Sequence, residues 1–260
     1  APGSELPGPT TFLGRKDNTF YFVDQYNAEF NRTIQPVKGQ YTDNYYMQMV
    51  ENIRKYKGVR EIPRNSGLRK SKPDGITDEW KDVKSYYLDT KGDTYHRDHN
   101  GYAGLRYTND SGRNDIVEAK VTTDRKYMNF YVRTDSTMTP YTDKNWMLLL
   151  IDADHDSSTG WYGYDFIVNL EVKSDCKTTL KRYDSKLGQW TDAATIDYAV
   201  NGCEMELRVP RKLMGLTGDD VTFDFKWADN PQSLDTPISL CTDGDTAPNR
   251  RFNYRYIWQK

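Results

Sequence analysis

The sequence predicts a mostly β protein, an antiparallel sandwich or barrel with one amphipathic helix near its N-terminus. Three observations favour this fold class. From about residue 84 onward, short runs of β-branched and aromatic residues recur, and most of them alternate apolar with polar side chains. Clusters of turn-forming residues separate these runs. No long helical pattern lies between them, which argues against a parallel sheet with crossover helices.

The expected strands follow one another with short connections. Asn201-Gly202 is the strongest hairpin signal, because this pair favours a two-residue turn between antiparallel strands. Other connections, such as residues 154–160 and 184–188, are rich in Asp, Ser and Gly. In chain order, the expected strands are residues 85–89, 115–123, 126–134, 145–152, 163–172, 178–184, 195–200, 203–210 and 221–229.

The N-terminal part has a different pattern. Residues 18–23 are strand-like, and the segment after Asp43 predicts a helix that ends before Gly58. Its apolar face would carry Tyr46, Met47, Val50, Ile53 and Tyr56. We therefore expect a strand-helix segment and linker over residues 1–64, which could be the tail of an upstream domain, followed by a β domain over residues 65–260.

Charge and composition exclude several classes of partner. Lys and Arg total 36 against 38 Asp and Glu, so the net charge of −2 offers no general basic field for nucleic acid. The longest apolar run, residues 146–151, is far shorter than the roughly 20 residues of a membrane-spanning helix. The three cysteines allow one disulfide at most. Cys176 and Cys203 could pair in an exported protein, or both could be free, buried thiols.

An acid-rich hairpin is expected over residues 152–169. Asp152, Asp154 and Asp156 are two residues apart, so on a regular strand they would share one face and repel one another. A turn that begins near Asp154 would instead let their oxygens converge on a hard cation such as calcium. The alternative is a turn whose carboxylates accept hydrogen bonds from their own backbone amides.

The calcium prediction does not rest on an EF-hand. Ser157 or Thr159 stands where that loop requires glycine in the two registers tested. The register that begins at Asp154 does place Asp165 at the last ligand position. The predicted metal ligands are therefore Asp152, Asp154, Asp156 and Asp165, with calcium in a structural role.

Aromatic residues in predicted turns are the candidate ligand-binding groups. Trp161 and Tyr162 lie between two glycines at a hairpin tip, where a large ring either packs on a neighbouring loop or contacts a ligand. Trp190 lies in a second turn-like segment, and Trp80 follows a turn and could be core or ligand-binding. Exposed rings of this kind stack on the C–H faces of sugars. Trp146 and Trp227, within strand patterns, are expected in the core.

No catalytic residues are assigned. The sequence contains no Ser-His-Asp, HExxH or phosphate-loop pattern, and His96 with His99 is only a weak metal-binding pair. Asp24 and Glu29 are the best candidates for the paired acids of a glycoside hydrolase. However, only about 60 residues precede the linker, against roughly 250 for a complete (β/α)₈ barrel. An enzyme in this chain is therefore less expected than a binding module.

Several segments together resemble the family 9-like carbohydrate-binding modules, a DOMON-like β-sandwich group. They are KPDGITDEW at residues 72–80, NDIVEAKVTTDRKYMNFYVRT, NWMLLLIDADHDSSTGWYGYDFIVN, CEMELRVPRKLMGL and VTFDFKWADN. The resemblance covers residues 72–260. It implies a β-sandwich of about ten strands, jelly-roll or immunoglobulin-like, in which calcium can be structural and tryptophans sandwich a sugar. Residues 20–58 resemble a region that precedes such modules in large bacterial saccharide-active proteins.

The expected function is therefore non-catalytic binding of a polysaccharide or oligosaccharide through Trp161, Tyr162, Trp190 and Trp80. The resemblance implies an exported bacterial glycan-utilisation protein, located outside the cell, in the periplasm or on the cell surface, with an upstream catalytic domain as a possible partner. No organic cofactor and no membrane insertion are expected. The alternatives are a glycoside hydrolase fragment, a ligand-free structural sandwich, and haem binding through Met and His, which DOMON relatives can perform.

Overall fold

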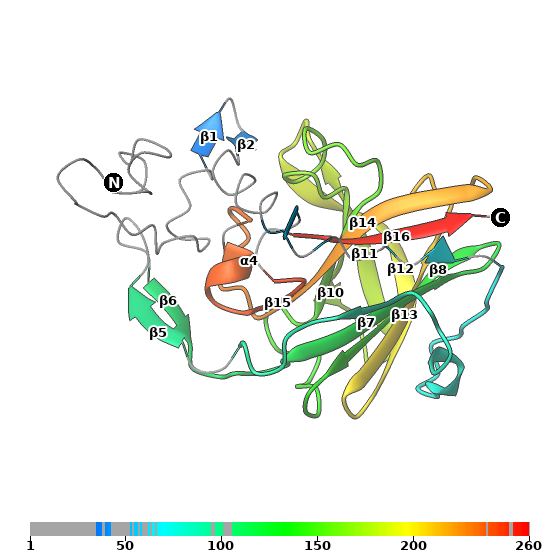
Figure 1. Cartoon of the computed structure of the whole chain (residues 1–260), viewed down its shortest axis with the longest axis horizontal. Coiled ribbons are helices and arrows are strands. Elements are labelled where there is room, and N and C mark those ends of the chain that lie inside the picture. Colours follow the sequence, from blue (N-terminus) through cyan, green and yellow to red (C-terminus); the bar gives the residue numbers. More distant parts are fainter. Residues whose placement is uncertain are drawn as a thin grey trace. The chain divides into compact units, whose positions relative to one another are not determined.

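A computed structural model describes residues 35–37, 40–42, 53, 55–56, 58, 62, 64–65, 67–94, 97–100, 106–237, 239–249 and 252–259 (Figure 1). Of the expected N-terminal helix, Ile53, Lys55 and Tyr56 are described and are helical. The expected strand at residues 18–23, the acids Asp24 and Glu29, and His96 lie outside the described residues, as does the side chain of His99.

Most of the described chain is β-strand. Two short sheets do not pair with the main one: β1 (Gln35–Val37) pairs with β2 (Gln40–Thr42), and β5 (Arg97–Asn100) pairs with β6 (Arg106–Asn109). The main sheet belongs to a compact unit of residues 62–98 and 108–260. Its strands are β3 (Arg64–Asn65), β4 (Tyr86–Leu88), β7 (Ile116–Thr123), β8 (Tyr127–Thr134), β9 (Leu148–Asp152), β10 (Phe166–Val172), β11 (Lys177–Asp184), β12 (Gln189–Asn201), β13 (Glu204–Pro210), β14 (Asp220–Asp229), β15 (Asp245–Ala247) and β16 (Tyr254–Gln259).

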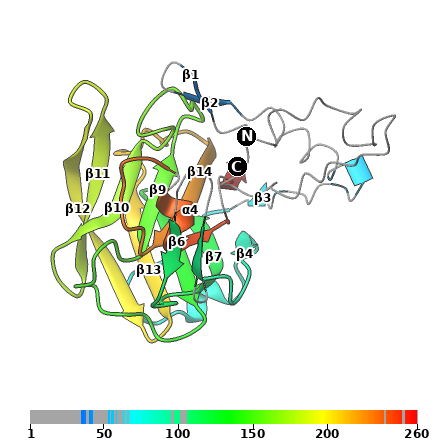
Figure 2. The same ribbon diagram turned by 90° about the vertical axis from the view of Figure 1, so that its left-hand side faces the viewer.

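The main sheet is one continuous antiparallel ladder in the order β16-β14-β9-β10-β11-β12-β13-β8-β7-β4. β3 adds to it in parallel beside β16, and β15 pairs with β14. The long strand β12 makes the ladder continuous, because residues 189–197 pair with β11 and residues 198–201 pair with β13. Figure 2 shows β10, β11 and β12 side by side on one flank of this sheet. The hairpin predicted at Asn201-Gly202 is confirmed, but its two turn residues are Gly202 and Cys203, because Asn201 still pairs with Glu204.

The two ends of the ladder are joined by side chains. The Tyr87 hydroxyl on β4 donates a 2.8 Å hydrogen bond to the Arg255 carbonyl on β16. In return, the Tyr254 hydroxyl on β16 donates a 3.1 Å hydrogen bond to the carbonyl of Leu88. The sheet is therefore nearly closed and barrel-like, and the prediction of a mostly β, antiparallel fold is confirmed. Two short helical segments accompany it, the 3₁₀ turn η1 (Asp78–Trp80) and α4 (Ser239–Thr242).

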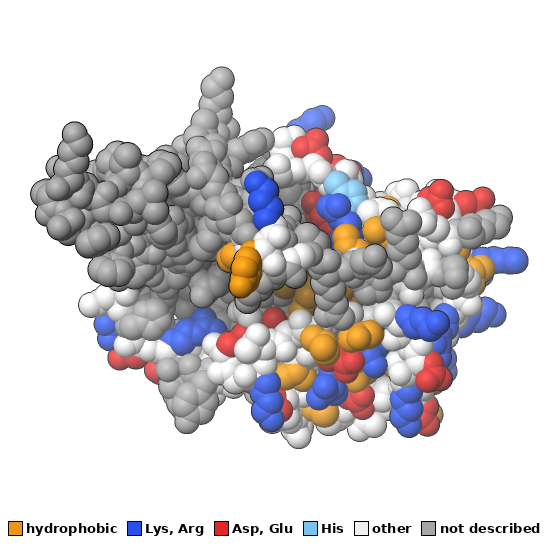
Figure 3. All heavy atoms as spheres, in the orientation of Figure 1, with side chains coloured by type: hydrophobic (Ala, Val, Ile, Leu, Met, Phe, Trp, Pro, Cys, Tyr) orange, Lys and Arg blue, Asp and Glu red, His pale blue; other side chains and the backbone are white. Residues whose placement is uncertain are grey.

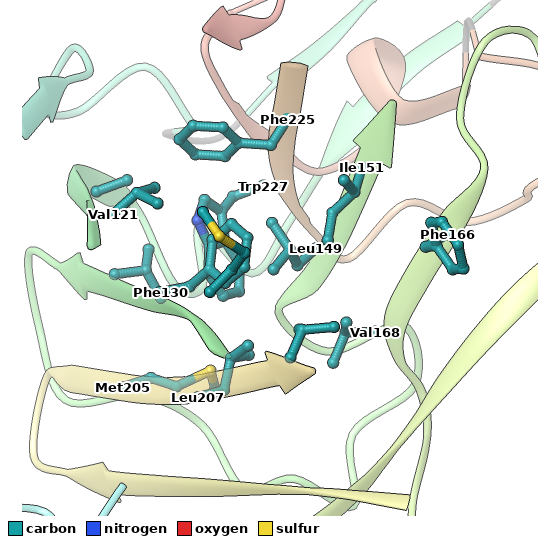
Figure 4. Close-up of a cluster of buried hydrophobic side chains, with 14 of the residues drawn as sticks. Val121, Phe130, Leu149, Ile151, Phe166, Val168, Met205, Leu207, Phe225 and Trp227 are labelled. Carbon is teal, nitrogen blue, oxygen red and sulfur yellow. The ribbon is translucent and has the colours of Figure 1, made fainter. Parts of the chain in front are cut away.

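The core lies inside this sheet. Phe130 on β8 packs with its ring centroid 5.8 Å from that of Phe223 and 5.9 Å from that of Phe225, so β8 and β14 meet at these rings. Figure 4 shows Phe130 and Phe225 among the buried side chains of this core. Trp146 and Trp227 are buried, with exposed fractions of 2% and 0%, as the strand patterns predict. Along β14, Val221, Phe223, Phe225 and Trp227 are alternate residues and all belong to this core, whereas Ala228 belongs to a second buried cluster.

Cys176 and Cys203 are both free, so the disulfide between them is not formed. Cys176 is exposed and Cys203 is half-buried, which shows that the expectation of two buried thiols is wrong. Cys176 lies in the turn between β10 and β11. Among the described residues, no helix has the length and apolar character needed to cross a lipid bilayer.

Candidate functional site

The loop between β9 and β10 places its aromatic residues through a tight local turn. Trp161 and Tyr164 exchange backbone hydrogen bonds of 2.8 and 3.1 Å, which puts their side chains on the same side. Gly160 is required there, because its φ is +60° and an added Cβ would lie 2.3 Å from the Tyr164 carbonyl oxygen. Tyr162, at the tip, also has a positive φ. The turn geometry therefore fixes where these rings lie.

The loop rings meet two rings from the β11–β12 hairpin. Trp161 lies 5.6 Å from Tyr162, 6.2 Å from Tyr164 and 6.3 Å from Trp190, measured between ring centroids. Tyr183 and Trp190 are paired across β11 and β12, with centroids 5.1 Å apart. We call these five residues the aromatic cluster. Its base is buried, since Trp161 is 6% exposed, whereas Tyr162 is 38% exposed and Trp190 is half-buried.

The structure brings three of the four predicted ligand-binding residues together. Trp161, Tyr162 and Trp190 belong to the aromatic cluster, but Trp80 lies elsewhere. Its ring is 1% exposed, stacks on Tyr131 and donates its Nε1 hydrogen to a carboxylate. A buried ring whose one donor is already used has no free face for a sugar. Tyr164 and Tyr183 were not predicted, although the hairpin turn at residues 184–188 places residue 183 opposite residue 190.

The acid-rich hairpin shows both converging carboxylates and carboxylates that accept hydrogen bonds from backbone amides. Carboxylate oxygens of Asp152, Asp154 and Asp165 lie within 4.8 Å of one another, and Asp156 is not a member of this group. Every one of these acids also accepts a hydrogen bond from a nearby backbone amide. The amides belong to His155 for Asp152, Asp156 for Asp154, Ser158 for Asp156 and Ala153 for Asp165, at 2.7 to 2.9 Å.

A second set of charges borders the hairpin. Arg255 donates hydrogen bonds of 2.7 and 2.8 Å to the two carboxylate oxygens of Asp224, and its Nη2 lies 3.5 Å from His155 Nδ1. Asp152, His155 and Asp224 also have ligand atoms within 4.8 Å of one another. The guanidinium already supplies positive charge on that side. The group formed by Asp152, Asp154 and Asp165 is therefore the better candidate of the two for holding a cation.

Burial raises the pKa of Asp152 to about 6, against the lowering effect of the His155 amide. Burial likewise raises the pKa of Asp165, against the Ala153 amide. The group of Asp152, Asp154 and Asp165 offers only carboxylate oxygens, which are the ligand atoms that calcium prefers.

On the face drawn in Figure 3, acidic and basic side chains are interspersed among the described residues, in keeping with the net charge of −2.

The hairpin and the aromatic cluster are physically linked. The Tyr183 amide donates a 2.9 Å hydrogen bond to the carbonyl of Asp165, so β11 holds the acids and the rings in one unit. A ligand that stacks on Tyr162 or Trp190 would therefore contact a surface whose base is fixed by two hairpins.

In comparisons with protein-family models, with curated proteins and with solved structures, the chain matched none.

Proposed function

We propose that this protein is a non-catalytic carbohydrate-binding module of the family 9-like β-sandwich type, which docks on a glycan through its aromatic cluster. The observation that carries the proposal is the arrangement of two accessible rings over a buried aromatic base. Tyr162 and Trp190 retain exposed surface, whereas Trp161 and Tyr164 beneath them are buried. The protein would belong to an exported bacterial glycan-utilisation system, because its polymeric ligand lies outside the cytoplasm.

The physical basis is stacking of a sugar ring on an aromatic face. The C–H bonds on one face of a pyranose pack against the electron-rich face of Tyr or Trp. A preorganised ring loses little conformational freedom on binding, which favours affinity. The buried base of the aromatic cluster provides that preorganisation, since Trp161 belongs to one buried apolar cluster with Leu148, Leu150 and Ile167.

We propose further that calcium braces the acid-rich hairpin through Asp152, Asp154 and Asp165, with Asp156 as an outer contributor. Three carboxylates at this separation fit the oxygen ligands of calcium, and the ion would hold the loop that carries Trp161. The test is thermal unfolding with and without chelator. The expected result is a chelator-induced fall in melting temperature that is smaller in Asp154→Asn than in the wild type. An equal fall in the two proteins would leave amide capping as the role of these acids.

The binding function is tested by calorimetric titration of the full chain with a panel of oligosaccharides. We expect dissociation constants of about 1 mM or tighter for at least one sugar, and weakening of about tenfold in Tyr162→Ala and in Trp190→Ala. Tyr86→Ala is the matched control, because Tyr86 is 40% exposed on β4, outside the aromatic cluster. Absence of binding by folded wild-type protein would contradict the proposal.

A ligand-free structural module is the second candidate. It is favoured by the burial of Trp161, whose exposed fraction of 6% leaves little surface for a ligand. The same titration separates the two functions. A structural module would bind no sugar, and Trp161→Phe would lower its melting temperature without any effect on a binding curve.

A further inference from the structure

A second group of acids shares no residue with the acid-rich hairpin. Asp89 follows β4, Asp93 lies in the turn after it, and Asp245 begins β15. One carboxylate oxygen from each of the three lies within 4.8 Å of the others. Asp245 is 1% exposed, so at least one of these carboxylates is fully enclosed by protein.

Asp115, just before β7, adjoins this group through the backbone. The amide of Gly92, next to Asp93, donates a 2.6 Å hydrogen bond to Asp115 Oδ2. The amide of Ile116, next to Asp115, donates a 2.7 Å hydrogen bond to Asp245 Oδ2. Four carboxylates are therefore gathered where β4, β7 and β15 meet. Asp115 is itself 8% exposed.

The decisive observation is that each of these four carboxylates has one buried oxygen without a hydrogen-bond partner. These atoms are Asp89 Oδ2, Asp93 Oδ1, Asp115 Oδ1 and Asp245 Oδ1. Among the residues that the structure describes, no lysine or arginine forms an ion pair with any of the four. A buried carboxylate oxygen without a hydrogen-bond or ion-pair partner is destabilising, because it has lost its hydration without replacement. Four adjacent unpaired oxygens point to a missing positive partner.

The acid-rich hairpin provides an internal comparison. There, Asp152, Asp154 and Asp165 all accept amide hydrogen bonds. At the hairpin, no carboxylate oxygen of these three acids is therefore buried without a partner, whereas each carboxylate of the group around Asp245 has one such oxygen.

We propose that Asp89, Asp93 and Asp245 bind a calcium ion, with Asp115 as a fourth carboxylate beside it. Calcium takes oxygen ligands at about 2.3–2.6 Å, so any two oxygens on one ion can be up to about 5 Å apart, which accommodates the observed group. Magnesium requires a smaller octahedron and retains several waters, which fits an enclosed set of carboxylates less well. This inference does not depend on carbohydrate binding.

Asn249 is placed to complete the site. Its Nδ2 donates a 3.2 Å hydrogen bond to Asp89 Oδ1 and a shorter one to Asp93. Rotation of this amide by half a turn would present Oδ1 to the cation in place of the donor. The ion would then connect the turn after β4 with β15, which pairs with β14, and would hold the two faces of the sheet together near β7.

The test is calcium binding to the full chain after exhaustive chelation, measured by calorimetry and by thermal unfolding. We expect a calcium-dependent rise in melting temperature, and a loss of affinity of at least about tenfold in Asp93→Asn and in Asp89→Asn. Without calcium, both variants should melt at or above the wild-type temperature, because one of several repelling charges is gone. Asp154→Asn is the control and should keep this site, whatever calcium does at the acid-rich hairpin.

Two results would overturn the proposal. One is the absence of calcium binding by the folded wild type at millimolar calcium. The other is an unchanged calcium affinity and melting response in both Asp89→Asn and Asp93→Asn. Loss of all calcium binding in Asp154→Asn with retention in Asp93→Asn would assign the ion to the hairpin and would also contradict this site. Asp93 is only half-buried, so its variant tests the site without the risk of misfolding that Asp245→Asn carries.

Discussion

The Nε1 of Trp80 donates a 3.0 Å hydrogen bond to Oε2 of Glu206, and both residues are about 1% exposed. The other carboxylate oxygen of Glu206 accepts hydrogen bonds of 2.9 and 2.8 Å from the amides of Asp74 and Gly75. One buried carboxylate on β13 thus fixes the segment that precedes β4. The Asp-Gly turn and the tryptophan of the KPDGITDEW segment are explained by this attachment rather than by ligand binding.

Removal of this contact should destabilise the fold. In Glu206→Gln, an NH₂ group would replace one of the two acceptor oxygens. The single remaining oxygen could not accept the indole hydrogen as well as the two backbone hydrogens. We expect a loss of about 2–3 kcal/mol in unfolding free energy, and a similar loss for Trp80→Phe, because a buried partner is left unsatisfied in each case. Urea unfolding measures the loss. Asp220→Asn, an exposed acid-to-amide change, should leave the midpoint unchanged, and equal behaviour of Glu206→Gln would refute this role.

The hydrogen bonds that close the sheet lead to a second prediction. Tyr87→Phe and Tyr254→Phe each delete a hydroxyl that bonds to a carbonyl across the gap between β4 and β16. Each should cost about 1 kcal/mol of stability. Because the two rings lie 4.9 Å apart, the double variant should not be additive. Tyr127→Phe removes a hydroxyl for which the described chain provides no hydrogen-bond partner, and it should change stability least.

The strands and their inward faces are the part of the fold that the sequence predicts well. Val221, Phe223, Phe225 and Trp227 alternate with polar residues, and all four are buried. Period-two alternation is a local property, so it is readable without the fold. The pairing of β4 with β16 through side chains is not local, since it depends on how the whole ladder curves. The approach of Asp93 to Asp245 depends on the same curvature, which is why the sequence did not predict that group.

The central position of Phe225 gives a third prediction. Its ring contacts those of Tyr87, Phe130, Phe223 and Tyr254, and its exposed fraction is 0%. Phe225→Ala would leave a cavity where the two faces of the sheet meet, and we expect a loss of about 3–5 kcal/mol. Phe225→Leu should cost less, because more of the volume is retained. Guanidinium unfolding distinguishes the two variants, and equal midpoints would contradict a closely packed contact.

The aromatic cluster could be predicted only in part, for a physical reason. Trp161 and Tyr162 occupy a turn bounded by glycines, which marks an unusual backbone but not what the rings contact. Their exposure depends on β11 and β12, which bring Tyr183 and Trp190 against Trp161. A tip residue that would be exposed on an isolated hairpin is therefore covered by its neighbour. The spacing of residues in the sequence alone does not show how far the β11–β12 hairpin buries Trp161.

The ion pairs of Asp197 give a prediction about pH. Lys177 lowers the pKa of Asp197 through a hydrogen bond, burial opposes this, and Arg208 lowers it further. A carboxyl group with a lower pKa in the folded state than in the unfolded state stabilises the fold above the unfolded value, about 3.9. That contribution is lost as the pH falls below this value and through the folded pKa. The stability of the wild type should therefore fall more steeply in acid than that of Asp197→Asn.

At pH 7 the variant should be less stable by about 0.5–1 kcal/mol, a modest value because the three side chains are partly solvated and screened. The difference between the two proteins should vanish once the pH is below the folded pKa of Asp197, where this group is protonated in both states, and should shrink in 1 M salt as the ionic attraction is screened. Urea unfolding at a series of pH values measures it. Asp175→Asn, in the nearby turn, controls for the loss of one surface charge. A constant difference between wild type and Asp197→Asn from pH 2 to pH 7 would show that the carboxylate contributes through packing and not through its charge.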